Sequence, residues 1–267
     1  MTSMYSKTER AQPELPPELT DRIIDFLHDE PKTLAACSLV ARSWTIASRY
    51  HLFSMVVLIN PERRAKFERL IQISPTMIQY IRGVFIDVDG IYSTRWISVC
   101  ARFTSLQHIM MNGVVAPPWR SEAAVISRVA RNITSFTLSL AIVHRDDVWP
   151  IIRTFPNLVS LAYVGAKSVP ASAQPLQSSF PSHTPQISSI SVTTSASWDV
   201  LEALADPPYP LISLSNLNIQ YAYPGQGRGL QALAQAYGSQ ISRLRLQILG
   251  RSPRCTSSHP SQPPPSC

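Results

Sequence analysis

The sequence predicts an α/β protein, α+β overall, in which a short helical segment precedes an irregular solenoid of strand–helix repeats with one parallel sheet. Apolar residues recur at every fourth position near the N-terminus, as on one face of a helix. Farther along, a six-residue apolar pattern occurs seven times, and helical periodicity fills most of the intervals between its occurrences. Hydrophobic residues make up 45% of the 267 residues, which is enough for a core in each part.

Three helices are expected within residues 14–53, after a disordered start at residues 1–13. Two prolines suit the start of the first helix because a missing N–H costs nothing there. Pro31 precedes the second helix, and Trp44 begins the third. So small a segment cannot enclose much core, so its apolar faces must dock on the rest of the chain or on another protein. The residues that share one face of the first helix are Leu15, Leu19, Ile23 and Leu27.

An LPxEL start, a V-x-x-x-W end and a closing Leu-Phe pair mark residues 14–53. The residues that carry these features are Leu15, Pro16, Glu18, Leu19, Ile23, Leu27, Leu34, Cys37, Val40, Arg42, Trp44, Leu52 and Phe53. With them the segment resembles an F-box, in the form common in fungal proteins. The resemblance implies docking to a Skp-type adaptor, and through it to cullin, in a Skp–cullin–F-box ubiquitin ligase. The implied adaptor-binding residues are Leu15, Pro16, Leu19, Ile23, Leu34, Val40 and Trp44.

Two alternatives stay open at this point. The helices are also compatible with a plain cap that covers the end of the solenoid and recruits nothing, as in a non-catalytic scaffold protein. Trp44 could face the solenoid instead of an adaptor. Exposure decides between these hypotheses, because an adaptor surface cannot be buried against residues after 54.

The link from the helices to the solenoid is predicted as one strand and one helix. Residues 54–59 form a short β-branched apolar run that is typical of a strand. Residues 61–73 have helical periodicity, with Phe67, Leu70 and Ile71 on the apolar face. The predicted polar side of this helix carries Arg63, Arg64, Lys66 and Arg69.

The solenoid prediction depends on an internal repeat over residues 54–250. The pattern apolar-x-x-apolar-x-apolar begins at Ile81, Leu106, Ile133, Leu158, Ile187, Leu214 and Ile241. Successive starts are 25, 27, 25, 29, 27 and 27 residues apart. With these spacings the chain resembles a leucine-rich repeat, which implies a right-handed arc with a parallel sheet on one side.

The match to that family is degenerate. Three residues after the last apolar position, where the family usually has Asn or Cys, this chain has Asp89, Val114, Ala141, Ala166, Ser195, Ala222 and Leu249. The buried amide ladder of regular repeats is therefore missing, and we expect an irregular arc. An ordinary α/β domain with evenly spaced strands is the alternative.

Helices are expected between the strands at 94–102, 121–130, 146–155, 198–205 and 230–237, with Pro150 in the first turn of the third. Residues 168–185 are rich in Ser, Pro and Gln and are expected to form an extended loop. The glycines from 225 to 229 are expected to form a flexible lead into the last helix. Residues 251–267 are expected to be a disordered tail, which would leave the final strand as an exposed edge.

Alternation along each strand predicts which side chains face the open, concave side of the arc. Positions three, five and seven of the pattern should face it, and most of these residues are short and polar. The candidate substrate-binding residues among them are His108, Asn112, Ser135, Thr137, Asn216, Asn218, Gln220, Arg243 and Arg245. The two arginines favour an acidic or phosphorylated segment. A solvated sheet face that binds nothing remains the alternative.

Nothing in the sequence predicts catalysis, and the expectation is a non-catalytic interaction protein that needs no cofactor. The six histidines and four cysteines do not fall at metal-ligand spacings, so no metal site is predicted. The net charge of +7 is scattered, which gives a nucleic-acid partner little support. No apolar run is long enough to span a bilayer, so no membrane partner is expected. Isolated cysteines suit a reducing compartment, the cytoplasm or the nucleus.

Overall fold

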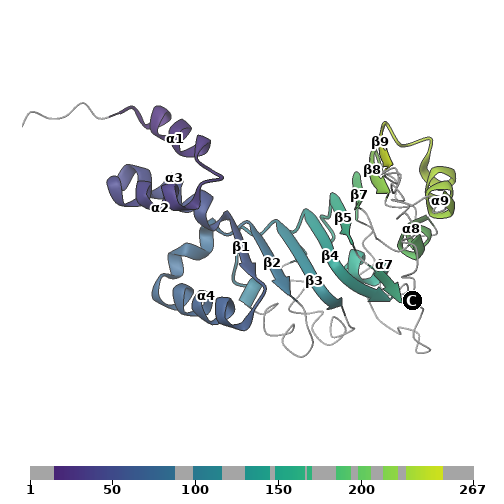
Figure 1. The fold of residues 1–267 in the computed structure, drawn as a ribbon, viewed down its shortest axis with the longest axis horizontal. Helices are drawn as coiled ribbons and strands as arrows, with labels where there is room; N and C mark the ends of the chain where they lie inside the picture. The colour runs from purple at the N-terminus through teal and green to yellow at the C-terminus, as the bar shows by residue number, and fades with distance from the viewer. Residues whose placement is uncertain are drawn as a thin grey trace, which may run out of the picture.

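The computed structural model describes residues 15–87, 99–115, 130–144, 148–165, 167–169, 185–193, 198–205, 213–221 and 227–248. The predictions for both chain ends, for most of the helices at 94–102 and 121–130 and for most of the loop at 168–185 lie outside these residues. In Figure 1 the N-terminal helices lie at one end of a curved sheet, and the last strand lies at the other end.

The first element group consists of the three predicted helices, α1 (Pro17–Phe26), α2 (Pro31–Val40) and α3 (Arg42–Ser54). Proline is the first residue of both α1 and α2, where its missing N–H has no helical partner to lose. Ile24, Leu34 and Cys37 are buried between the helices, and Trp44 and Leu52 pack against them. This small core is separate from the core of the sheet.

The link to the sheet has the predicted form, with β1 (Met55–Leu58) followed by α4 (Pro61–Ile73). The side chain of Asn60 caps α4 by accepting a hydrogen bond from the N–H of Arg63 at 2.8 Å. A 3-10 helix, η1 (Pro75–Tyr80), then leads into the next strand. Phe67 and Ile71 are buried as predicted.

Arg64 does not lie on the polar side of α4, where the sequence prediction placed it. It is 8% exposed, and its guanidinium donates hydrogen bonds to the carbonyl oxygens of Leu58, at 3.0 Å, and of Asp87. These carbonyls end β1 and the strand beside it, so the arginine joins α4 to two neighbouring strands. The charge is tolerated inside because backbone oxygens accept from it.

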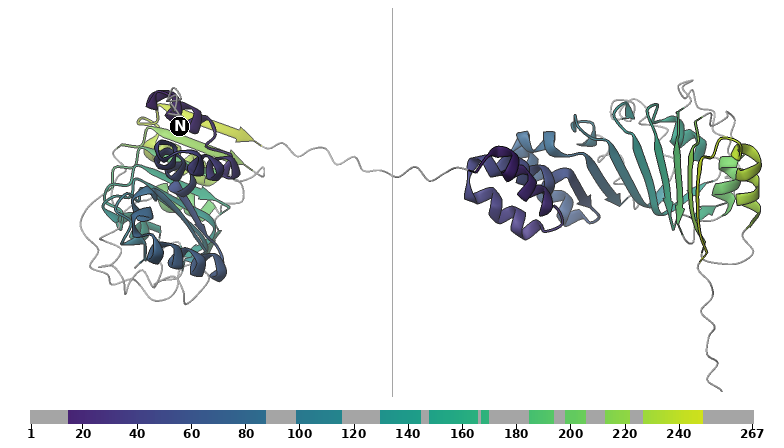
Figure 2. Two further views of the ribbon diagram at one scale, coloured as in Figure 1. Left: turned by 90° about the vertical axis from the view of Figure 1, so that its left-hand side faces the viewer. Right: turned by 90° about the horizontal axis from the view of Figure 1, so that it is seen from above.

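All strands of the sheet are parallel, and the sheet is open, which confirms the predicted solenoid-like α/β architecture. Their order follows the sequence from β1 to β9, with one exception. The short strand β6 pairs with the last three residues of β4, farther along β4 than the part that pairs with β5. The right-hand view of Figure 2 shows the strands following one another from the helices to the far end. The strands after β1 are β2 (Gly83–Asp87), β3 (His108–Val115), β4 (Ser135–His144), β5 (Ser160–Val164), β6 (Lys167–Val169), β7 (Ser189–Thr193), β8 (Asn216–Tyr221) and β9 (Arg243–Ile248).

The register pairs every repeat in the same phase. The third position of the pattern pairs across the whole sheet, from Gly83 through His108, Ser135, Ser160, Ser189 and Asn216 to Arg243. The apolar positions therefore form continuous buried rows from β2 to β8, such as the row that contains Phe136, Leu161 and Ile190, each 0% exposed. The helices α4, α7, α8 and α9 lie on the outer, convex side of the sheet (Figure 1).

The spacing between repeats is set by a hydrogen-bond ladder where the strands begin. The N–H groups of Ser215 and Asn216 both donate to the carbonyl of Ser188, and the Ser215 hydroxyl donates there too, at 3.2 Å. Ser242 repeats this arrangement one repeat later on the carbonyl of Ser215. Hydroxyls at the second pattern position thus link neighbouring repeats at the starts of the strands. The buried amides that usually link repeats at the other end of the strands are missing from this sequence.

Two predictions for the second half of the chain need adjustment. Lys167–Val169 forms the short strand β6, so the predicted extended loop begins later than residue 168. Helix α9 (Gly227–Tyr237) includes two of the glycines that were expected to lead into it. The sheet is irregular at Gly113, where φ is 94° and the pairing of β3 with β4 shifts register.

Helices α7 (Val148–Arg153) and α8 (Trp198–Ala205) occupy predicted helical stretches, and Pro150 lies in the first turn of α7 as expected. In the part of the chain that the structure describes, no helix combines the length and the apolar character that crossing a bilayer requires.

Candidate functional site

Two surfaces of this fold are candidates for function: the outside of the three-helix segment and the concave face of the sheet. The helical segment joins the sheet through α3, which runs directly into β1. Tyr50 of α3 also stacks under the guanidinium of Arg82, 5.0 Å from the ring centroid. The starts of β1 and β2 are therefore connected to the helices, while most of the helical surface projects away from the sheet (Figure 1).

Three of the four residues of the predicted apolar stripe face outward, whereas Leu27, just after α1, packs against the small helical core. Leu15 is 52% exposed, Leu19 is 47% exposed and Ile23 is 41% exposed, whereas Thr20 and Ile24 on the other side of the helix are buried. In the part of the chain that the structure describes, residues after 54 leave these three side chains exposed. The stripe therefore meets the exposure condition that separates a docking surface from a cap sealed by its own chain.

Two of the predicted adaptor contacts lie elsewhere. Leu34 is 1% exposed because it fills the small core between the helices, so its expected place on the docking surface was wrong. Trp44 is half-buried against that same core, which also rules out the alternative that it faces the solenoid. Pro16 is exposed, and Val40 is 69% exposed at the end of α2.

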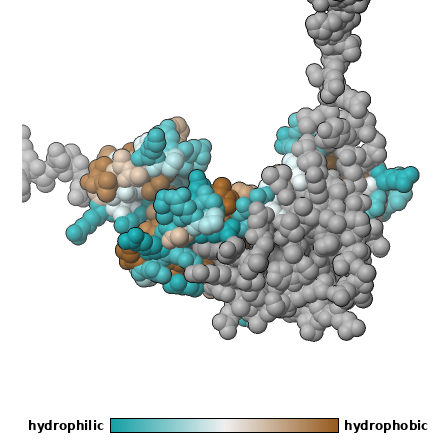
Figure 3. All heavy atoms as spheres, turned by 60° about the horizontal axis from the view of Figure 1, so that its bottom comes forward, coloured by the Kyte–Doolittle hydropathy of each residue, from teal (hydrophilic) through white to brown (hydrophobic). Residues whose placement is uncertain are grey.

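The sequence analysis missed three exposed apolar side chains on the helical segment. Phe26 is 88% exposed, Leu39 is 86% exposed and Ile46 is 65% exposed. Phe26 follows Leu19 and Ile23 at helical spacing, which was the available signal for it. Figure 3 shows hydrophobic side chains at the surface of this segment, at the left of the view.

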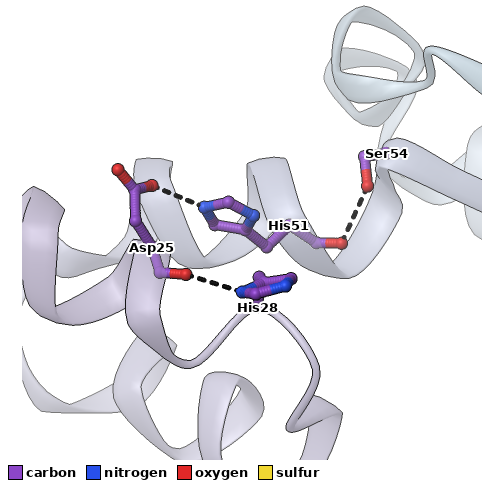
Figure 4. A network of polar contacts seen from close by, with 4 residues as sticks. All are labelled: Asp25, His28, His51 and Ser54. Atoms are coloured by element: carbon purple, nitrogen blue, oxygen red, sulfur yellow. Dashed lines mark hydrogen bonds and ion pairs between the residues drawn. The ribbon is translucent and has the colours of Figure 1, made fainter.

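Polar contacts hold the exposed helix in place. The carboxylate of Asp25 in α1 accepts a hydrogen bond from Nε2 of His51 in α3 at 2.8 Å. Nδ1 of His28 donates to the carbonyl of Asp25 at 2.9 Å, and the Ser54 hydroxyl donates to the carbonyl of His51 at 3.1 Å. Figure 4 shows how this chain of contacts connects the end of α1 to the end of α3. The orientation of the apolar stripe is thereby fixed relative to β1.

On the concave face the register brings the predicted substrate residues together. His108 and Ser135 lie in one row with Asn216 and Arg243, and Thr137 lies in the next row with Asn218 and Arg245. Asn112 and Gln220 lie in a third row. Met55 and Val57 of β1 extend the first two rows, and the sequence analysis missed them although it predicted their strand.

The chemistry of the concave face changes from one end to the other. Apolar side chains such as Phe85 and Met110 occur at the β2–β3 end, and hydroxyls dominate β4 to β7. Amides follow on β8 and exposed arginines on β9. The amide nitrogen of Asn112 donates to Asp87, and that of Asn218 donates to Ser191, each at 3.3 Å. The face is therefore suited to hydrogen bonding with a polar chain laid across it.

Both cysteines of the described residues, Cys37 and Cys100, are buried. Cys100 is buried in the main core, and this burial raises the pKa of its thiol to about 12, so it remains protonated and unreactive at neutral pH. Within the described ranges, no three residues among His, Cys, Asp and Glu are placed to hold a metal ion.

The arrangement as a whole presents two candidate binding surfaces, which α3 and β1 connect. No protein-family model and no curated protein matches this chain.

Proposed function

We propose that this protein is the substrate-recognition subunit of a Skp–cullin–F-box ubiquitin ligase. The helical segment binds a Skp-type adaptor, and through it cullin, in the cytoplasm or nucleus. The sheet presents a protein substrate on its concave face. The observation that carries the proposal is the exposed stripe of Leu19 and Ile23, on a segment whose residue pattern resembles an F-box.

The exposed apolar surface is large enough to matter. Covering the exposed parts of Leu15, Leu19, Ile23 and Phe26 would contribute about 3–7 kcal/mol, at about 1.5–3 kcal/mol for a fully buried side chain. Leu39, Val40 and Ile46 would contribute a similar amount. Because association costs about 4–15 kcal/mol before any net affinity appears, a stable complex needs both groups of side chains in the interface.

The experiment measures binding of the full chain to a recombinant Skp-type adaptor by surface plasmon resonance. In the Leu19→Ala/Ile23→Ala variant we expect binding about tenfold weaker or worse, because two partly exposed anchors are truncated. The matched control is Ile59→Ala/Ile73→Ala, which truncates two apolar side chains that are also exposed but lie outside the helical segment. Absence of binding by the wild-type chain, or equal loss in both variants, contradicts the adaptor assignment.

A second candidate is a scaffold protein whose helices only protect the first edge of the sheet. The contact of Tyr50 with Arg82 and the direct run of α3 into β1 favour this role. The same experiment separates the two functions, since a scaffold requires no adaptor binding and is indifferent to Leu19 and Ile23.

The substrate surface is tested separately on the concave side. Asn216 and Asn218 lie two residues apart on β8, where they pair with Arg243 and Arg245 of β9. An Asn216→Ala/Asn218→Ala variant should retain adaptor binding and lose capture of a phosphorylated peptide that has no alternating apolar residues and therefore does not pair along β9. Unchanged capture would contradict a substrate role for this part of the face.

A further inference from the structure

The last strand of the sheet departs from all earlier repeats in what it exposes. Leu244 is 56% exposed and Leu246 is 43% exposed, whereas their counterparts on β8, Leu217 and Ile219, are 2% and 0% exposed. Strand β9 is also the edge of the sheet, since it pairs only with β8 among the described strands. One side of the edge is therefore apolar and built like the core, yet open to solvent.

The other side of the same strand is cationic. Arg243 and Arg245 alternate with the leucines and are exposed on the concave face. Within the described part of the chain neither guanidinium is in an ion pair. Cross-strand neighbours of opposite charge stabilise a sheet, and like charges destabilise it.

We propose that β9 is a binding edge for a strand of another protein in which acidic and apolar residues alternate. Such a strand pairs with the free backbone groups of β9 and covers Leu244 and Leu246 with its apolar side chains. Its carboxylates lie beside Arg243 and Arg245. This proposal does not depend on adaptor binding by the helical segment.

Charge decides against two other occupants. In a pair formed by two copies of β9, the arginines of one copy would lie on the same face as those of the other, which is unfavourable. Residues 249–267 of this chain contain no Asp or Glu, so they offer no carboxylate to the arginines. An acidic amphipathic strand from a partner satisfies both sides of β9 at once.

The test measures fluorescence anisotropy of a labelled synthetic peptide of alternating glutamate and leucine, titrated with the full-length protein. We expect the Arg243→Glu/Arg245→Glu variant to bind it at least about tenfold more weakly, and to bind a lysine–leucine peptide in its place. The matched control, Arg63→Glu/Arg69→Glu, makes the same change of charge at exposed positions of α4, near the other end of the sheet (Figure 1). Thermal melting of each variant establishes that it is folded.

Further variants identify the surface that is used. A Leu244→Thr/Leu246→Thr variant should also lose the peptide, whereas Asn216→Ala/Asn218→Ala should retain it because only the concave face is changed. The proposal is overturned if the wild-type protein does not bind the peptide, or if charge reversal leaves binding unchanged. It is also overturned if Asn216→Ala/Asn218→Ala abolishes binding. Sedimentation that shows dimers through β9, lost in the leucine variant, would assign the edge to a second copy and overturn the acidic partner.

Discussion

Replacing Tyr163 by phenylalanine should stabilise this protein, although the residue lies in the centre of the core. Tyr163 is 0% exposed on β5, in the row that contains Leu138 and Val192. Its hydroxyl oxygen is buried and has no hydrogen-bond partner among the described residues. The substitution removes this one polar atom and leaves the ring and its packing unchanged.

The size of the effect follows from the lost hydration of the hydroxyl. A buried polar group without a partner costs about 1–3 kcal/mol relative to the same group in water. Removing the oxygen leaves a small unfilled space that offsets part of this gain. We expect a net increase of about 1 kcal/mol in the free energy of unfolding, or about 2–4 °C in Tm for a chain of this size.

A pH dependence should accompany this gain. Burial raises the pKa of the Tyr163 hydroxyl above the ordinary value of 10.0 in the folded state. As the pH rises past 10, the unfolded state loses this proton while the folded state keeps it, so stability falls by up to about 1.4 kcal/mol per pH unit. The phenylalanine variant should lose this part of the alkaline destabilisation. Cys100, with its pKa raised from 9.0 to about 12, contributes in the same direction between those two pH values in both proteins.

Urea denaturation followed by circular dichroism measures both effects, at pH 7.5 and across the alkaline range. The control is Tyr237→Phe, because Tyr237 is also buried but donates its hydroxyl hydrogen to the carbonyl of Leu204 at 3.2 Å. This variant should be destabilised by about 0.5–1.5 kcal/mol. If Tyr163→Phe is destabilised as much as Tyr237→Phe, the hydroxyl of Tyr163 is satisfied and the reasoning is refuted.

Two further substitutions test a contact between α4 and the sheet and the close packing at the end of α9. Arg64→Met should lower the free energy of unfolding by about 2–4 kcal/mol, because the carbonyls of Leu58 and Asp87 lose a charged donor. The control is Arg63→Met, at an exposed position, which should change the free energy of unfolding by less than about 0.5 kcal/mol. Urea denaturation measures both variants. Gly238→Ala should cost about 1–3 kcal/mol, because its methyl group would overlap the backbone oxygen of Ala234. Gly83→Ala meets only the flexible end of a methionine side chain and should cost less than about 1 kcal/mol, so equal losses of Tm in the two alanine variants would contradict this account.

The sequence predicted the repeat register because its signal has the same phase in every strand. Side chains alternate along a strand, so slipping one strand by a single residue would place Arg243 and Arg245 in the core and Leu244 on the concave face. Only the in-phase alignment keeps Leu161, Ile190 and Leu217 in one buried row, and the structure has that alignment. The concave residues followed from the same argument without any knowledge of their partners.

The helical segment was harder to predict because α1 carries apolar residues on more than one side. Leu19 and Ile23 form one apolar stripe, and Ile24 with Thr20 forms the side that is buried. Periodicity shows that a stripe exists but not which neighbour covers it. The placement of Leu34 failed for the same reason, since an apolar residue in a small bundle can serve the bundle core or a partner equally well.

The position of Arg64 could not be inferred from its own helix. A charged residue on a surface helix is expected to face solvent unless buried hydrogen-bond acceptors lie within its reach. Here the acceptors are the carbonyl ends of β1 and β2, which come together only after the parallel sheet has formed. The same holds for the hydroxyl ladder, in which Ser215 and Ser242 look like ordinary surface serines until their repeats stack.

Because each strand start of this ladder bonds to the repeat before it, the next acceptor in the series is the carbonyl of Ser242. A strand that joined β9 would extend both the ladder and the buried rows, which gives the edge a structural preference for a strand over any other kind of partner.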